Sequence, residues 1–121
     1  MTGTQLAFLV VTLFTVAINV GMAAADLAGA RFVLANSAQV GVPRSWLPWL
    51  AVLKLAGAAG LLLGLFDAAP RALGAAAACG LVLLYMGALG FHLRARVLYN
   101  IAFPGFYFAT AVASLALIVA A

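Results

Sequence analysis

Four long runs of apolar residues, separated by short connections, most constrain how this chain can fold. A helix needs about 20 predominantly apolar residues to cross a bilayer, and each run is that long. The chain is 69% hydrophobic and 7% charged, whereas a soluble domain carries about 25% charged residues. The sequence therefore predicts an integral membrane protein that contacts the lipid bilayer directly. We expect membrane-spanning helices at about residues 5–26, 48–66, 71–93 and 100–120.

The connections between these spans predict the topology. The second and third connections are short, and short connections make consecutive helices antiparallel. Residues 1–121 should thus form one domain, an all-α, antiparallel up-down bundle of four transmembrane helices. The first connection, residues 27–47, is the longest. Its segment 31–35 either extends the first helix or lies at the membrane interface.

The basic residues predict the orientation, because cytoplasmic loops are enriched in Lys and Arg. One arginine, Arg71, is expected on the side of the chain termini. The opposite side carries Arg31, Arg44, Arg94 and Arg96. We therefore expect this second side to be cytoplasmic and both termini to lie outside. The basic residues are scattered rather than clustered, which argues against nucleic-acid binding.

Lys54 lies well inside the second span, about 9 Å along the helix axis from Pro48. An ammonium group near the bilayer interior costs about 2.5–3.5 kcal/mol, so it usually faces a partner or a wet cavity. Asp26 is the only acidic residue expected in the same half of the membrane. The sequence therefore predicts a buried cluster of Lys54 and Asp26, which His92 can join. The alternative is that Lys54 extends to the headgroups, with His92 at the interface and Asp26 in a loop cap.

Other polar residues follow helical spacing within the spans. Thr12, Thr15 and Asn19 share one face of the first span, and Tyr85 lies seven residues before His92 in the third. Lipid offers no hydrogen-bond partners, so these faces should point into the bundle. We expect the threonines to form interhelical or same-helix hydrogen bonds. The predicted pocket is lined by Lys54, His92, Asp26, Asn19, Tyr85 and Asn100.

Small residues recur on the second and third spans and predict close helix packing, with a homodimer face as the alternative. They are Ala56, Gly60 and Gly64 on the second span, and Gly74, Ala78, Gly80, Gly87 and Gly90 on the third. The single cysteine, Cys79, excludes a dithiol mechanism within this chain. One histidine and two aspartates do not supply the ligands of a structural zinc site, so no metal site is predicted.

Several short motifs carry a family resemblance. In chain order they are Gly41-Val-Pro43, the glycine-rich run 53–64 that contains Lys54, Pro70-Arg71, and His92. From about residue 8 to residue 118 the chain resembles the DoxX-like family of small bacterial membrane proteins. The resemblance implies a four-helix domain in the bacterial inner membrane, in which Lys54 and His92 match the family's polar positions. The wider group is associated with thiosulfate–quinone oxidoreduction and with redox complexes that contain partner proteins.

These observations leave three functions open. In the first, the pocket binds a lipophilic small molecule such as a quinone, whose carbonyls accept from Lys54 while His92 relays protons. In the second, the protein is a membrane isomerase or hydrolase, with Asp26 or His92 as the general acid or base. In the third, it is a non-catalytic subunit of a larger membrane redox complex, assembled with itself or with a partner subunit.

Overall fold

The computed structural model describes the backbone of residues 1–66 and 68–121, and side chains at 1–66 and 70–121. Asp67 therefore lies outside the described residues. Four helices are long and apolar enough to cross a membrane, and the described residues contain no β-strand. The elements are α1 (Gly3–Ala28), α2 (Arg31–Val40), the 3₁₀ turn η1 (Arg44–Trp46), α3 (Leu47–Leu63), α4 (Ala68–Arg94) and α5 (Ala102–Ala120). The predicted helical membrane bundle is confirmed, and the protein is a multi-pass membrane protein.

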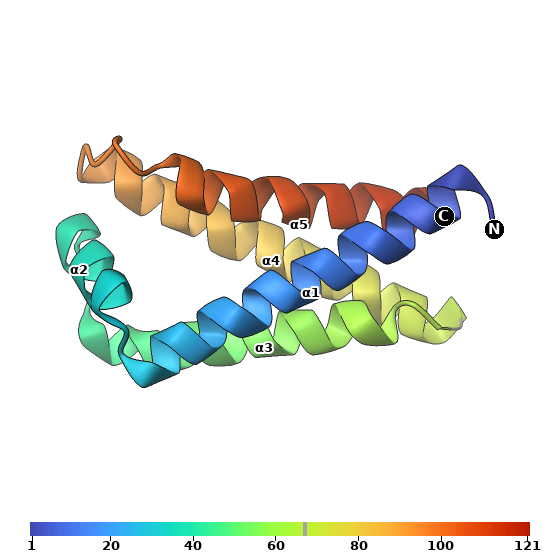
Figure 1. Cartoon of the computed structure of the whole chain (residues 1–121), viewed down its shortest axis with the longest axis horizontal. Coiled ribbons are helices and arrows are strands. Elements are labelled where there is room, and N and C mark those ends of the chain that lie inside the picture. Colours follow the sequence, from blue (N-terminus) through green and yellow to red (C-terminus); the bar gives the residue numbers. More distant parts are fainter. Residues whose placement is uncertain (67) are drawn as a thin grey trace.

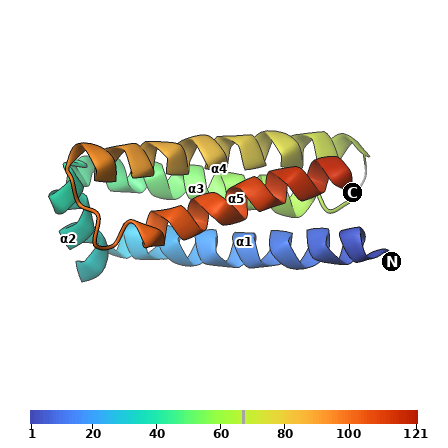
Figure 2. The same ribbon diagram turned by 90° about the horizontal axis from the view of Figure 1, so that it is seen from above.

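The long helices form a ring in which each packs against two neighbours. Going around the ring, α1 contacts α3, α3 contacts α4, α4 contacts α5, and α5 returns to α1. Consecutive long helices are antiparallel, and both chain termini lie at the same end of the bundle (Figure 1). The short helix α2 lies across the opposite end, where α1 and α4 finish and α3 and α5 begin (Figures 1 and 2).

The structure excludes one of the two alternatives predicted for segment 31–35. This segment does not extend α1 but begins α2, a separate helix of ten residues. Gly29 ends α1 with φ of 64°, and Gly41 ends α2 with φ of 81°. A left-handed residue stops a helix and redirects the chain, and glycine adopts that conformation without steric cost. The two glycines therefore set α2 across the end of the bundle.

The observed helix boundaries also differ by a few residues from the predicted ones. The helix α1 begins earlier, at Gly3, because Thr2 and Gln5 form a reciprocal capping box. The helix α3 ends at Leu63 rather than at residue 66. The helix α5 begins at Ala102, so Asn100 lies in the turn before the helix and not in its first turn.

Close packing joins α3 to α4 through glycines. A Cβ atom added at Gly60 would lie 2.5 Å from the Cβ of Ala77, and one added at Gly64 would lie 2.8 Å from the Cα of Gly74. The predicted packing role of Gly60 and Gly64 is confirmed, because no side chain fits in these positions. On α4 the prediction was only partly right, since Gly80, Gly87 and Gly90 face open space.

The polar face of α1 points into the bundle, as its spacing predicts. Thr12, Thr15, Asn19 and Asp26 are all buried. The Thr15 hydroxyl lies 3.0 Å from the hydroxyl of Ser114 on α5 and donates to the Val11 carbonyl at 2.7 Å. These contacts satisfy polar groups that lipid would leave unpaired.

Candidate functional site

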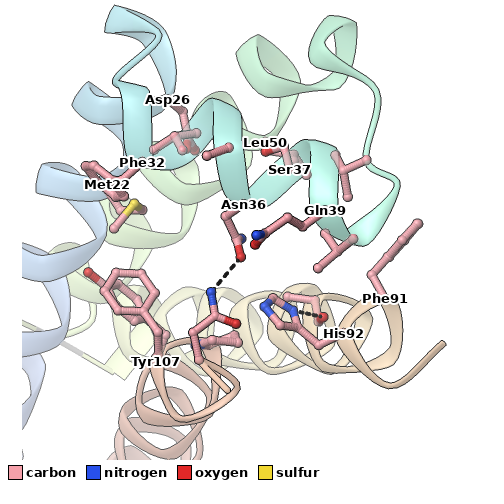
Figure 3. Close-up of a pocket in the computed structure, with 18 of the residues that line it drawn as sticks. Met22, Asp26, Phe32, Asn36, Ser37, Gln39, Leu50, Phe91, His92 and Tyr107 are labelled. Atoms are coloured by element: carbon pink, nitrogen blue, oxygen red, sulfur yellow. Dashed lines mark hydrogen bonds between the residues drawn. The ribbon is translucent and has the colours of Figure 1, made fainter. Parts of the chain in front are cut away.

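A cavity of about 400 Å³ lies beneath α2 at one end of the bundle, and all five α-helices contribute to its wall (Figure 3). Most of its lining is apolar. The apolar side chains include Met22, Phe32, Leu50, Phe91 and Phe103. The polar side chains come from all four long helices, from α2 and from the α4–α5 connection. They are Asp26, Asn36, Ser37, Gln39, Lys54, Tyr85, His92, Tyr99, Asn100 and Tyr107.

Asp26 and Lys54 form an ion pair in the wall of this cavity. The Lys54 Nζ lies 2.6 Å from Asp26 Oδ2, and the two side chains are 11% and 3% exposed. Helical spacing positions both groups: Asp26 lies seven residues after buried Asn19, and Lys54 lies three residues before buried Gly57. The predicted pairing is therefore present, and the Lys54 side chain is largely buried beside Asp26.

The ion pair leaves hydrogen-bonding capacity unused. An ammonium group has three N–H donors, and the described residues provide Lys54 with one acceptor, Asp26. A carboxylate accepts about four hydrogen bonds, and Lys54 is the only partner of the Asp26 carboxylate among the described residues. Because both residues line the cavity, their remaining capacity is available to a molecule inside it.

His92 lies in the wall of the same cavity but does not join the ion pair. Its side chain is 3% exposed, and its Nδ1 lies 3.0 Å from the carbonyl oxygen of Ala88, one turn earlier in α4 (Figure 3). Its Nε2 is buried and has no hydrogen-bond partner among the described residues. The predicted cluster is thus an ion pair on α1 and α3, with a separate histidine on α4.

Asn19 does not line the cavity, although it was predicted to. Its Oδ1 accepts a short hydrogen bond from the Tyr85 hydroxyl, and its Nδ2 donates to the Thr15 carbonyl at 2.8 Å. Tyr85 does line the cavity. Asn19 therefore supports the floor of the site by holding Tyr85, which in turn packs against the ring of Tyr107 at 5.4 Å between centroids.

The helix α2 covers the cavity and is joined to the α4–α5 connection by two hydrogen bonds. Asn100 Nδ2 donates to Asn36 Oδ1 at 3.0 Å, and the Tyr99 hydroxyl donates to Gln39 Oε1 at 2.8 Å. Asn36, Gln39 and Tyr99 were not among the predicted pocket residues. Their spacing is the signal that was missed, since Asn36 and Gln39 are three residues apart and share a face if residues 31–40 are helical.

The match of a protein-family model agrees with this architecture. The model describes the DoxX-like family and matches residues 10–114 of the chain. Comparisons with curated proteins and with solved structures found no match. The matched segment includes α3 and α4 completely, most of α1 and α5, and every polar residue of the cavity. The chain therefore belongs to the DoxX-like family.

Proposed function

We propose that this membrane protein binds a lipophilic small molecule with a hydrogen-bonding head group, of which a quinone is the leading example. The observation that supports the proposal is the buried Asp26–Lys54 pair, which borders an otherwise largely apolar cavity. A buried ion pair is weak evidence for stability, because apolar residues in its place are often neutral or stabilising. Its presence within a transmembrane bundle argues for a role in binding.

The size and surroundings of the cavity suit such a ligand. Small-molecule pockets span about 300–1,000 Å³ and are mainly apolar, with a few polar groups that orient the ligand. The cavity has about 400 Å³, enough for a ring system and part of an isoprenoid or alkyl tail. Lys54 offers free N–H donors to a head-group carbonyl, while the apolar side chains of α2, α4 and α5 surround the remainder.

Ligand retention tests this proposal. Native mass spectrometry of protein extracted into nanodiscs should detect a small lipophilic molecule on the wild type and none on the double variant Asp26→Asn/Lys54→Met. The double variant removes both charges and so avoids leaving one of them unpaired in the interior. A control variant, Arg31→Met, removes an exposed positive charge outside the cavity and should retain the ligand. Equal retention by all three proteins would contradict the proposal.

A second candidate, acid–base catalysis on a lipophilic substrate, is favoured by one observation. The free Nε2 of His92 lies in a wall of the cavity and its ring is held by the Ala88 carbonyl, as in a positioned general base. The molecule found bound to the wild type would first be tested as a substrate. If the wild type converts it, the His92→Phe variant should not. Binding without turnover in the wild type would exclude this candidate and leave the binding function.

We also propose that the α2 end of the bundle faces the cytoplasm and that both termini are outside. Four arginines, two of them in the α1–α3 connection and two at the end of α4, support this orientation. In a Cys79→Ala background, a membrane-impermeant maleimide applied to intact cells should label Thr4→Cys. It should label Ser45→Cys only after permeabilisation. The opposite labelling pattern would reverse the orientation.

A further inference from the structure

The hydrogen bond of His92 determines which kind of group its free nitrogen can meet. The Ala88 carbonyl oxygen can only accept, so Nδ1 of His92 carries the proton of their 3.0 Å contact. In a neutral imidazole, one nitrogen donates and the other accepts. Nε2 is therefore an acceptor, and it is buried without a donor among the described residues. A molecule bound in the cavity can supply the missing donor.

Asn100 provides a second free acceptor in the same wall. Its amide nitrogen donates to Asn36, which leaves its Oδ1 as the unused atom. That oxygen is buried and has no partner in the part of the chain that the structure describes. Because α4 packs against α5, His92 near the end of α4 and Asn100 just before α5 belong to one side of the cavity. This side offers acceptors.

The opposite side carries the Asp26–Lys54 pair, which adds free donors. Asp26 and Lys54 lie on α1 and α3, which pack against each other across the ring from the α4–α5 side. Figure 3 shows Asp26 and His92 on opposite sides of the cavity, with Asn36 of α2 between them. Lys54 there has N–H groups that Asp26 does not use. A ligand that spans the cavity thus meets the free N–H donors of Lys54, beside the Asp26 carboxylate, at one end and the free acceptors of His92 and Asn100 at the other.

We infer that the cavity selects a ligand with a hydroxyl donor facing His92, so that a quinol binds more tightly than the corresponding quinone. This inference rests on the proposed binding function. Quinone carbonyls only accept hydrogen bonds, so they satisfy Lys54 but leave His92 Nε2 and Asn100 Oδ1 unpaired. A quinol has a hydroxyl at each end of its ring, and a hydroxyl both donates and accepts. One hydroxyl accepts from Lys54 while the other donates to His92.

Three matched ligands test the inference on the full-length protein in nanodiscs. They are a short-chain benzoquinol kept anaerobic, its quinone, and its dimethyl ether, which keeps the ring but lacks both donors. The quinol should bind about tenfold more tightly than either of the others, as expected for a buried acceptor that gains its donor. Tenfold preference for the reduced form also raises the midpoint potential of the bound two-electron couple by about 30 mV.

Variants locate the preference. His92→Phe should remove most of the preference for the quinol over the quinone, because it removes the acceptor of the quinol hydroxyl. Thr12→Val is the matched control, because the Thr12 hydroxyl is also buried and unpartnered among the described residues but does not line the cavity. Equal affinity of the wild type for quinol, quinone and ether would overturn the inference and leave the binding function intact. If the wild type bound none of the three ligands, both the inference and the proposed binding function would be overturned.

Discussion

Replacement of Lys54 by methionine should destabilise the bundle by about 3–5 kcal/mol, the usual cost of leaving one member of a buried ion pair without its partner. Asp26 is 97% buried, and Lys54 is its only ionic partner in the described residues. Asp26 also lies in the last turn of α1, where the helix dipole disfavours a negative charge. The free energy of unfolding in detergent, measured by denaturant titration, gives the effect directly.

The double variant separates charge imbalance from loss of packing. Asp26→Asn/Lys54→Met should recover most of the lost stability, because it leaves no buried charge uncompensated. Arg31→Met is the control for removal of a positive charge, and its exposed position predicts a change within about 0.5 kcal/mol. If Lys54→Met were as stable as the wild type, Asp26 and Lys54 would not form a buried ion pair in the folded protein.

The parts of the fold that follow from lipid exposure were predictable from the sequence. Each span has to satisfy its own backbone and turn its polar groups inward, and both requirements act through the period of a single helix. That period places Asp26 and Lys54 on the faces of their helices that point into the bundle. Because Asp26 is the only acidic residue expected in that half of the membrane and Lys54 lies inside a span, their pairing could be predicted without knowledge of the packing.

The cover of the cavity was not predictable in this way. The helix α2 is short and of mixed polarity, and its Asn36 and Gln39 are also typical of a loop. Its place depends on two left-handed glycines and on hydrogen bonds to residues about 60 positions away along the chain. Asn19 was misplaced for a related reason, because its hydrogen bond to Tyr85 arises only when α1 and α4 are brought together.

The glycines of α4 show that residue type alone does not predict which small residues pack against another helix. Gly74 and Ala78 are four residues apart and share the face that packs inside the bundle, where both are buried. Gly80 lies two residues beyond Ala78, which is about 200° around an α-helix. It therefore points outward, as do Gly87 and Gly90. The small residues of α4 thus belong to two faces with different surroundings.

A glycine in close helix contact and a glycine that faces open space should respond in opposite ways to substitution by alanine. Gly60→Ala should destabilise the protein by about 1–3 kcal/mol, because the new methyl group would lie 2.5 Å from the Cβ of Ala77 and force α3 and α4 apart. Gly87→Ala adds the same methyl group where nothing lies within 4 Å. It should be neutral or stabilising, since alanine favours a helix over glycine by about 1 kcal/mol. Thermal unfolding of both variants in the same detergent compares the signs.

A compensating substitution tests the contact itself. If the methyl groups at positions 60 and 77 exclude each other, the exchange Gly60→Ala/Ala77→Gly keeps one methyl group between α3 and α4 and should recover much of the stability lost in Gly60→Ala. Ala77→Gly alone should be destabilising, through its helix propensity and the space it leaves. The two changes would then be strongly non-additive, as expected for residues in contact. Additive effects, or a Gly60→Ala variant as stable as Gly87→Ala, would show that α3 and α4 do not approach each other at Gly60.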